Sequence, residues 1–317
     1  MFIIYINDLK NITKSFKFII YADDTTLIEP ICSFKNPADP SLKNLEDTIN
    51  TELNKVVEWL ALNKLSLNAK KTKMMIFHYK QRNIGKHLPR LKINNTEIER
   101  VKEFNFLGVT IDENMTWNAH TQKVANKVAQ VIGTLKRLKH FLPRNILKTL
   151  YCSLILPHLT YGIILWGRKT KRIRKLQKWA VRQIVNAKYN SHTEPIMKKL
   201  KLLSVNDLYN LAALKLHHKY NNNELPAYFT NIFTSQTPIH EYNTRHKQNR
   251  HQQSNTISAS HSPRYVVPRL IDALPNLITS TVKQVKLQCY TKTFKKLIIQ
   301  NYKEKCSIYK CYICNQL

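Results

Sequence analysis

Two adjacent carboxylates, Asp23 and Asp24, are the residues of this sequence with the clearest capacity for chemistry. They lie between two runs rich in β-forming residues, Lys17–Tyr21 and Thr25–Glu29, so the pattern predicts a tight hairpin with both acids at its tip. Like charges a few ångströms apart repel, and a bound divalent cation removes that repulsion. Mg²⁺ takes oxygen ligands and is commonly held by one or two carboxylates together with substrate phosphates. Taken alone, the same dipeptide also fits a solvated surface turn.

Three cysteines near the end of the sequence, Cys306, Cys311 and Cys314, have a spacing that could bind a metal. A structural zinc site needs four ligands, so His261 or Cys289 would have to complete the set. The six cysteines are otherwise scattered without the framework of a small secreted protein, which is typical of a reducing compartment. The role of the three terminal cysteines stays open.

The segments around the acid pair predict a mixed α+β unit. A helix is expected from Asp39-Pro40 to about Leu60, because Asp-Pro is a favourable start and apolar residues recur at steps of three and four. Short strand-like runs follow at Lys73–Tyr79, Leu88–Ile93 and Glu103–Ile111, with turn residues between or after them. Strands and one helix must therefore position the acidic hairpin.

Beyond Trp117 the periodicity becomes helical, which predicts an all-α region. The predicted helices cover about residues 124–138, 146–155, 171–186, 204–214 and 282–302. Ser204, with Asp207 three positions later, resembles a capping box. Residues 234–262 are rich in Ser, Thr, Asn, Gln and His, so we expect a mobile linker there.

The formal net charge of +31 is the strongest feature of the composition. Residues 1–112 hold 17 Lys and Arg against 13 Asp and Glu, whereas residues 113–317 hold 34 against 7. An excess of one sign on this scale repels itself unless a polyanion is nearby, so nucleic acid is the expected partner. An anionic membrane surface is less suitable, since no basic stretch also carries the continuous apolar face of an interfacial helix.

The predicted helix at 171–186 places Ile173, Leu176, Ala180 and Ile184 inward and leaves basic side chains outside. Basic residues of one sign without interspersed acids favour binding to phosphates, although an ordinary solvated face has the same pattern. The candidate nucleic-acid-binding residues are Arg168, Lys171, Arg172, Arg174, Lys175, Lys178 and Arg182.

Four motifs in the first part of the chain resemble the reverse transcriptases of non-LTR retrotransposons, the jockey-like elements in particular. Tyr21-Ala22-Asp23-Asp24, preceded by Phe-Ile-Ile, is similar to the hairpin signature of the polymerase palm. Phe2–Leu9, Asn63–Phe77 and Phe104–Asp112 resemble other segments of these enzymes, in the same order. The resemblance implies a partial polymerase palm as the fold of this region.

The resemblance also extends over most of the remaining chain. Similar segments of the helical thumb and the C-terminal tail are Leu156–Gly162, Leu165–Gly167, Leu176–Lys178, Tyr242–Arg245, Asp272–Pro275 and the helix around Phe294. The domains that it implies are a partial palm (1–112), a helical thumb (113–190), a helical extension (191–233), a mobile polar linker (234–263) and a C-terminal helical tail (264–317).

The family's chemistry gives expected roles to residues of this chain. Asp23 and Asp24 would be catalytic ligands of two Mg²⁺ ions, which promote attack of a primer 3′ hydroxyl on the α-phosphate of a dNTP. Lys71 and Thr72 would lie beside the incoming triphosphate, with a solvated lysine-rich turn as the alternative, and Gly108 would let a primer-gripping hairpin turn. The implied substrate-binding residues are Tyr21, Ala22, Lys71, Thr72 and Gly108. The implied partners are an RNA template and a DNA primer.

One departure from the family affects the expected activity. In the family, a further aspartate on an upstream strand completes the metal site, and the fingers and a Gly-rich nucleotide motif also lie upstream of the matched segments. Asp8 does not replace that aspartate, because its Ile-Asn-Asp-Leu context matches the following helix. We therefore expect weak Mg²⁺ binding and no polymerase turnover by this chain alone. The alternatives are a non-enzymatic basic nucleic-acid-binding protein and the remnant of a decayed element.

The N-terminal sequence has no basic region before its short apolar run, which argues against a secretory signal. The run from Leu150 to Trp166 is the best candidate for a membrane span, but Pro157 and His158 interrupt it and it is short for a span of about 20 residues. We expect a buried helix pair there, no membrane partner, and an intracellular location in the nucleus or cytoplasm.

Overall fold

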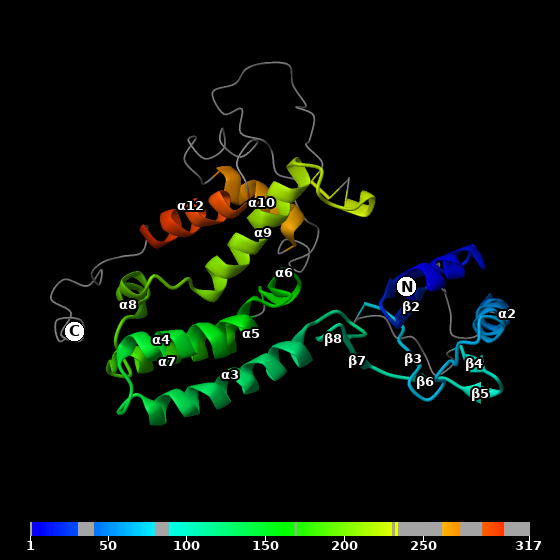
Figure 1. Ribbon diagram of the computed structural model, residues 1–317, viewed down its shortest axis with the longest axis horizontal. Helices are drawn as coiled ribbons and strands as arrows, with labels where there is room; N and C mark the ends of the chain where they lie inside the picture. Colours follow the sequence, from blue (N-terminus) through cyan, green and yellow to red (C-terminus); the bar gives the residue numbers. More distant parts are fainter. Residues whose placement is uncertain are drawn as a thin grey trace, which may run out of the picture. The chain divides into compact units, whose positions relative to one another are not determined.

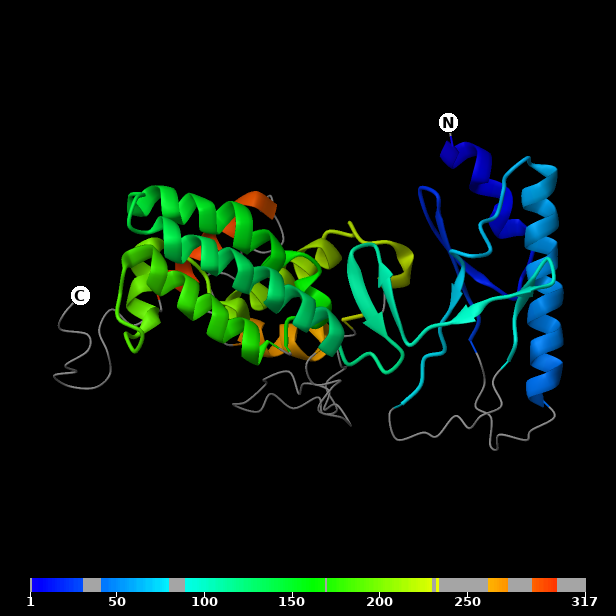
Figure 2. The ribbon, with the colours of Figure 1, turned by 90° about the horizontal axis from the view of Figure 1, so that it is seen from below.

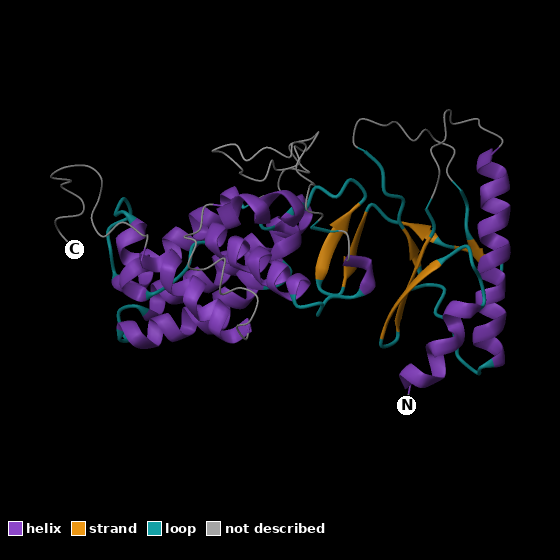
Figure 3. Ribbon diagram, turned by 90° about the horizontal axis from the view of Figure 1, so that it is seen from above, coloured by secondary structure: helices purple, strands orange, loops and turns teal. Residues whose placement is uncertain are grey.

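The computed structural model describes residues 2–30, 41–79, 89–168, 170–229, 232–233, 262–272 and 287–300. The chain divides into two compact units, Met1–Thr116 and Trp117–Leu317, and each is described by itself (Figure 1). In the described residues the strands are confined to the first unit and the second is helical (Figure 3). The mixed α+β class predicted from the sequence is confirmed; the finer domain division stays a prediction.

The first unit is built from short strands and one long helix. Its elements are α1 (Phe2–Ile6), η1 (Asn7–Asn11), β1 (Lys17–Tyr21), β2 (Asp24–Ile28), α2 (Ser41–Leu62), β3 (Lys73–Met74), β4 (Lys92–Ile93), β5 (Thr96–Glu97), β6 (Glu99–Arg100), β7 (Glu103–Phe106) and β8 (Val109–Asp112). Among the described residues the strands form four two-stranded ladders: β1–β2, β4–β5 and β7–β8 are antiparallel, and β3–β6 is parallel.

The apolar stripe of α2 holds this unit together. Ile49, Leu53 and Val56 are buried, and the first two share a cluster with Phe18 and Leu27 of the β1–β2 hairpin. The side chain of Asn50 also ties the helix to the β4 region, accepting from the Lys92 amide at 2.9 Å and donating to the Arg90 carbonyl at 3.1 Å. An isolated hairpin is marginally stable in water, so packing on α2 is what fixes β1 and β2.

Three strand predictions were only partly right. Of Leu88–Ile93 only β4, Lys92–Ile93, pairs as a strand, and residue 88 lies outside the described residues. Of Lys73–Tyr79 only β3, Lys73–Met74, pairs as a strand, and Glu103–Ile111 is two strands, β7 and β8, joined by a turn. A residue becomes part of a strand only where a neighbouring strand pairs with it, and β6 pairs with only two residues of Lys73–Tyr79. The β propensity of a segment does not show how long its partner strand is.

The second unit is a bundle of helices. They are α3 (Asn118–Leu138), α4 (Arg144–Leu150), η2 (Tyr151–Ile155), α5 (Leu156–Thr160), α6 (Ile163–Trp166), α7 (Lys171–Val185), α8 (Thr193–Leu200), α9 (Val205–Asn221), η3 (Ala227–Phe229), α10 (Pro263–Asp272) and α12 (Leu287–Gln300). Helix α7 has the predicted extent to within a residue, and Ser204 caps α9 by accepting from the Asp207 amide. Of the expected helix 282–302, α12 is the described part; the expected linker falls almost wholly outside the described residues.

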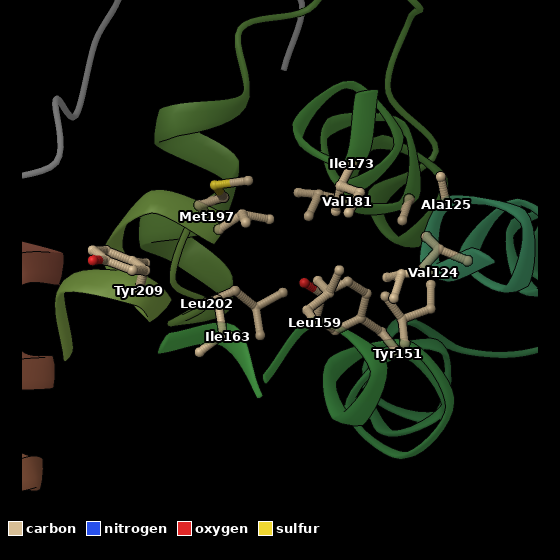
Figure 4. Packing of buried hydrophobic residues seen from close by; sticks show 14 of the residues in the cluster. Val124, Ala125, Tyr151, Leu159, Ile163, Ile173, Val181, Met197, Leu202 and Tyr209 are labelled. Atoms are coloured by element: carbon tan, nitrogen blue, oxygen red, sulfur yellow. The ribbon is translucent and has the colours of Figure 1, made fainter. Parts of the chain in front are cut away.

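One apolar core joins most of these helices, as Figure 4 shows for residues from Val124 to Tyr209. Its largest buried side chains include Trp166 and Tyr151, which are 1% and 0% exposed. A second cluster around Phe294 packs α12 on α9. No helix in the described part of the chain combines the length and the apolar character that a membrane span requires.

A widened π-type turn interrupts the long helix that α4, η2 and α5 form together. The Leu156 amide bonds to the carbonyl of Tyr151, five residues back, immediately before Pro157. Because proline has no N–H and its ring clashes with the preceding turn, the wider turn accommodates it without ending the helix. The expected pair of buried helices is therefore α4–η2–α5 followed by the short α6.

The side chain of Gln177, 1% exposed, joins three elements of this core. Its amide nitrogen donates to the Tyr151 hydroxyl and to the Leu203 carbonyl, each at 2.9 Å, and its oxygen accepts from the Val205 amide at 2.9 Å. A buried amide is stable only when its donors and acceptors are paired, and here they are. Gln177 therefore fixes α7 against the π-type turn and the start of α9.

Candidate functional site

The acid pair lies at the tip of a regular antiparallel hairpin. The register runs from Lys17 opposite Ile28 to Tyr21 opposite Asp24, so the turn consists of Ala22 and Asp23 alone. Asp24 is therefore the first residue of β2, directly after the turn, and the predicted hairpin with both acids at its tip is confirmed. Ala22 has φ 53°, the positive value that the tight turns of hairpins require at this position.

The two faces of this hairpin differ. Phe18 and Leu27, directly opposite each other, point to the α2 core, whereas the pair formed by Tyr21 and Asp24 lies on the exposed face. Tyr21 is 64% exposed, and Asp23 and Asp24 are exposed as well. The carboxylates are thus held at a fixed position of the fold and remain open to solvent and to a ligand.

Two exposed carboxylates fit part of a magnesium site. Within the described ranges neither acid forms a hydrogen bond or ion pair that would compete for a cation. The same ranges contain no group of three or more His, Cys, Asp or Glu residues placed to hold a metal. Mg²⁺ is commonly bound by one or two carboxylates, with water and substrate phosphates as the other ligands. Asp23 and Asp24 could supply the carboxylates of a site of this kind.

A second acid pair lies at the base of the hairpin. Glu29, directly after β2, is partly buried, and burial together with the nearby charge of Glu52 raises the pKa of its carboxyl. Glu52 has the opposite shift: hydrogen bonds from Lys55 and Thr13 lower its pKa. Glu29 and Glu52 therefore lie where α2 faces the base of the hairpin, apart from Asp23 and Asp24 at its tip.

Lys71 and Thr72 lie in a turn that leads into β3. The Thr72 hydroxyl donates to the Asn68 carbonyl at 3.1 Å, and Lys71 is exposed. Ala69 and Met74, which flank the pair, pack in the same apolar cluster as the strands of the acidic hairpin. One core therefore positions both segments, although in the described residues Lys71 and Thr72 form no hydrogen bond or ion pair with the two acids.

Gly108 lies in the turn of the hairpin β7–β8. Phe106 pairs with Val109, which leaves Leu107 and Gly108 as a two-residue turn with φ 46° and 81°. Positive φ at both positions defines the turn type that matches the twist of a hairpin, and glycine adopts it without strain. The geometry supports the expected turning role of Gly108.

Helix α7 carries most of the predicted basic residues on its exposed side: Lys171, Arg172, Arg174, Lys175 and Lys178. The other two, Arg168 and Arg182, make contacts within the helical unit, and Arg182 is less exposed than predicted. Arg168 precedes the helix, and its guanidinium carbon lies 4.8 Å from the centroid of the Tyr209 ring. Arg182 is only partly exposed; its Nε donates to the Ser191 carbonyl at 2.8 Å, and burial lowers its pKa. Arg182 therefore secures the chain after α7.

The backbone directly before Arg168 is tightly packed at Gly167. A Cβ atom at this position would lie 2.5 Å from the Ile163 carbonyl oxygen and 2.6 Å from Cδ2 of Tyr209. Only glycine lets the end of α6 approach α9 so closely. The neighbouring Trp166 is fixed by its indole N–H, which donates to the Tyr161 carbonyl at 2.9 Å.

The sequence reasoning missed the basic residues of α3, which packs along α7. Lys123, Lys127, Lys136 and Arg137 are exposed on it. A signal was present in the sequence: residues 114–193 hold 16 Lys and Arg and no Asp or Glu. The basic surface therefore extends over two helices.

No family model matches the chain, and no solved structure matches it. It is 25% identical over 202 residues to the RNA-directed DNA polymerase from mobile element jockey of Drosophila melanogaster, covering 61% of this chain and 20% of that protein. The jockey polymerase of Drosophila funebris is 25% identical over 182 residues, covering 55% and 19%. The probable RNA-directed DNA polymerase from transposon BS of Drosophila melanogaster is 23% identical over 194 residues, covering 59% and 20%.

The chain spans about a fifth of the length of these curated relatives. Identities of 23–25% over more than half of the chain agree with the resemblance to polymerases of mobile elements. The chain is thus a distant relative of the RNA-directed DNA polymerases of jockey and BS mobile elements.

Proposed function

We propose that this chain is part of an RNA-directed DNA polymerase of a mobile element and contributes a magnesium-binding hairpin and a basic nucleic-acid surface. The observation that carries the proposal is the exposed pair Asp23 and Asp24 at the tip of a tight antiparallel hairpin. The names of its distant relatives give the same polymerase class. The whole enzyme's activity is a proposal for the protein to which this chain belongs.

In this proposal Asp23 and Asp24 hold Mg²⁺. When bound, the metal would supply charge neutralisation for transfer of a nucleotide from a dNTP to a primer 3′ hydroxyl, with pyrophosphate as the leaving group. Lys71, exposed in the turn before β3, supplies positive charge toward the triphosphate, and Thr72 fixes that turn through Asn68. The β7–β8 hairpin, with Gly108 at its turn, supports the primer end.

The helical unit supplies the affinity for template and primer. Its exposed cations on α7 and α3 neutralise phosphates, a contribution that is largely independent of sequence and that falls as salt rises. The RNA template and the DNA primer are therefore the proposed partners, and dNTP the proposed substrate.

Magnesium-dependent binding of a primer–template duplex tests this proposal. Affinity is measured by fluorescence anisotropy with Mg²⁺ and with EDTA, for the wild type and for Asp23→Asn/Asp24→Asn. The double variant should lose the Mg²⁺-dependent gain. Asp47→Asn/Glu58→Gln, which removes two exposed acids of α2, is the control with the same charge change and should retain it. An equal Mg²⁺-dependent gain in all three proteins would refute the metal site.

A further inference from the structure

The helical unit exposes two aromatic rings at one of its ends. The C-terminal ends of α3 and α7 lie together there (Figure 2), where Nζ of Lys139 donates to Oδ1 of Asn186 at 2.9 Å. This hydrogen bond ties together the segments that follow the two helices. Phe141 in the first segment is 83% exposed, and Tyr189 in the second is 85% exposed. Two largely exposed aromatic side chains therefore lie on segments that are joined to each other.

A third aromatic ring, that of Trp179, lies within the last two turns of α7 and is 36% exposed. Arg182 follows it by three positions, so the two side chains are neighbours on the helix surface. The guanidinium carbon of Arg182 lies 6.0 Å from the centroid of the Tyr189 ring, and its Nε donates to the Ser191 carbonyl at 2.8 Å. Arg182 is thus the common neighbour of Trp179 and Tyr189, and most of the tyrosine ring stays accessible to a ligand.

Packing does not account for these exposed rings. Aromatic side chains carry a large apolar surface, and covering that surface is favourable. Single exposed apolar residues are common on protein surfaces, whereas a group of them marks a binding site. The three rings near this end of the unit form such a group, which we call the aromatic end: Phe141, Trp179 and Tyr189.

The surroundings of the aromatic end are cationic. Lys178 directly precedes Trp179, Lys188 directly precedes Tyr189, and both lysines are exposed. Residues 114–193, which include all three rings, hold 16 Lys and Arg and no Asp or Glu. The ligand that complements this surface is therefore anionic and also offers flat apolar faces to the rings. A nucleic acid meets both requirements through its phosphates and its bases.

We propose that the aromatic end binds single-stranded nucleic acid, with unpaired bases stacked on Phe141, Trp179 and Tyr189. The bases of a duplex are stacked on one another, so their faces are closed to a protein ring, whereas an unpaired strand exposes them. Every base has such a face, and binding is therefore tolerant of sequence. The inference goes beyond the proposed function, which concerns the phosphates of a primer–template duplex, and it does not depend on polymerase activity.

An anionic membrane is another surface that attracts both cations and aromatic rings. A helix that lies in a membrane interface presents a continuous apolar face. On α7 the positions around Trp179 are Lys175, Lys178 and Arg182, so the exposed side of this helix has no such face. The aromatic end therefore fits an unpaired strand better than a membrane.

Fluorescence anisotropy of the full chain with three probes tests the proposal. The probes are an oligo-dT strand of about 15 nucleotides, a strand of equal length built of abasic sites, and a blunt DNA duplex. The abasic strand keeps the phosphates and lacks the bases. The wild type should bind oligo-dT about tenfold more tightly than the abasic strand. Phe141→Ala/Tyr189→Ala should remove this preference, bind the other two probes as the wild type does, and keep its Tm because both side chains are exposed.

Two control variants separate ring stacking from other effects. Tyr189→Phe retains the ring and should keep the preference for oligo-dT. Tyr228→Ala removes a tyrosine that is 92% exposed on η3, and it should also bind as the wild type does. Stacking of a base quenches indole fluorescence, so oligo-dT should lower the tryptophan emission of the wild type and lower that of Trp179→Phe much less.

Equal affinity of the wild type for oligo-dT and the abasic strand, or an unchanged preference in the double variant, would overturn the stacking site. Binding to vesicles of phosphatidylserine and phosphatidylcholine that the double variant loses, while its affinity for oligo-dT stays unchanged, would assign the rings to a membrane instead. Failure of the wild type to gain duplex affinity from Mg²⁺ would overturn the proposed function and leave the aromatic end in place.

Discussion

Replacing Arg174, Lys175 and Lys178 of α7 with Gln should flatten the salt dependence of nucleic-acid binding. All three side chains are exposed, so each is available to one phosphate. Each neutralised phosphate contributes about 0.7–0.9 to the slope of log affinity against log salt, so the triple variant should lose about 2–3 of that slope. Between about 50 and 200 mM salt, the wild type should then lose about 30-fold more affinity than the variant does.

Arg182→Gln is the matched control on the same helix. Its guanidinium donates to the Ser191 carbonyl and lies 6.0 Å from the centroid of the Tyr189 ring. Because these contacts within the protein engage it, we do not expect it to bind a phosphate. This variant should lower Tm and leave the slope unchanged. Anisotropy titrations of a duplex at five salt concentrations measure all three proteins. An unaltered slope in the triple variant, or an equal change in Arg182→Gln, would refute the assignment of α7 as a phosphate-binding helix.

Three further changes test the packing and the electrostatics. Gly167→Ala should destabilise the protein by about 3 kcal/mol, since its Cβ would collide with a backbone oxygen that cannot move; chemical denaturation measures this, and an unchanged midpoint would contradict the close packing. Ala22→Gly should stabilise the hairpin by about 0.5–1 kcal/mol because it removes the cost of positive φ, and a lower Tm would count against that strain. Burial and the neighbouring His218 lower the pKa of His217 to about 4. The unfolded chain therefore binds its proton first as pH falls, and the free energy of unfolding should drop by about 1–2 kcal/mol between pH 7 and pH 5; His217→Phe should reduce that drop, and an identical pH dependence would reject it.

Several parts of the fold follow from local sequence patterns. The strands of the acidic hairpin, helix α2 and helix α7 were predicted because each depends on neighbours within a few residues: alternation of side chains, a repeat of three and four, or a capping residue. The cap formed by Ser204 is of the same kind. Where the residues that form an element and those that stabilise it lie in the same short segment, the sequence is sufficient to predict that element.

Other features depend on partners that are distant in the chain. The sequence could not show that β3 pairs with only two residues of β6, or that Arg168 and Arg182 are used by Tyr209 and Ser191. These outcomes are set by tertiary contacts, which override local propensity.

The surface shared by α3 and α7 shows the same limit. Its two halves are 50 residues apart at the contact between Gln122 and Arg172. The basic residues of each helix could be read from the sequence, but the packing of α3 along α7 required the fold.

The central claim is that the tip of the β1–β2 hairpin binds a divalent cation, and paramagnetic broadening by Mn²⁺ tests it most directly. Mn²⁺ prefers the oxygen ligands that suit Mg²⁺ and broadens nearby amide signals in an NMR spectrum. With a primer–template duplex present, the amides of residues 21–25 should broaden first, and Asp23→Asn/Asp24→Asn should abolish the effect. Broadening that begins elsewhere, for example at Glu29 and Glu52, or that persists in the double variant, would contradict the account.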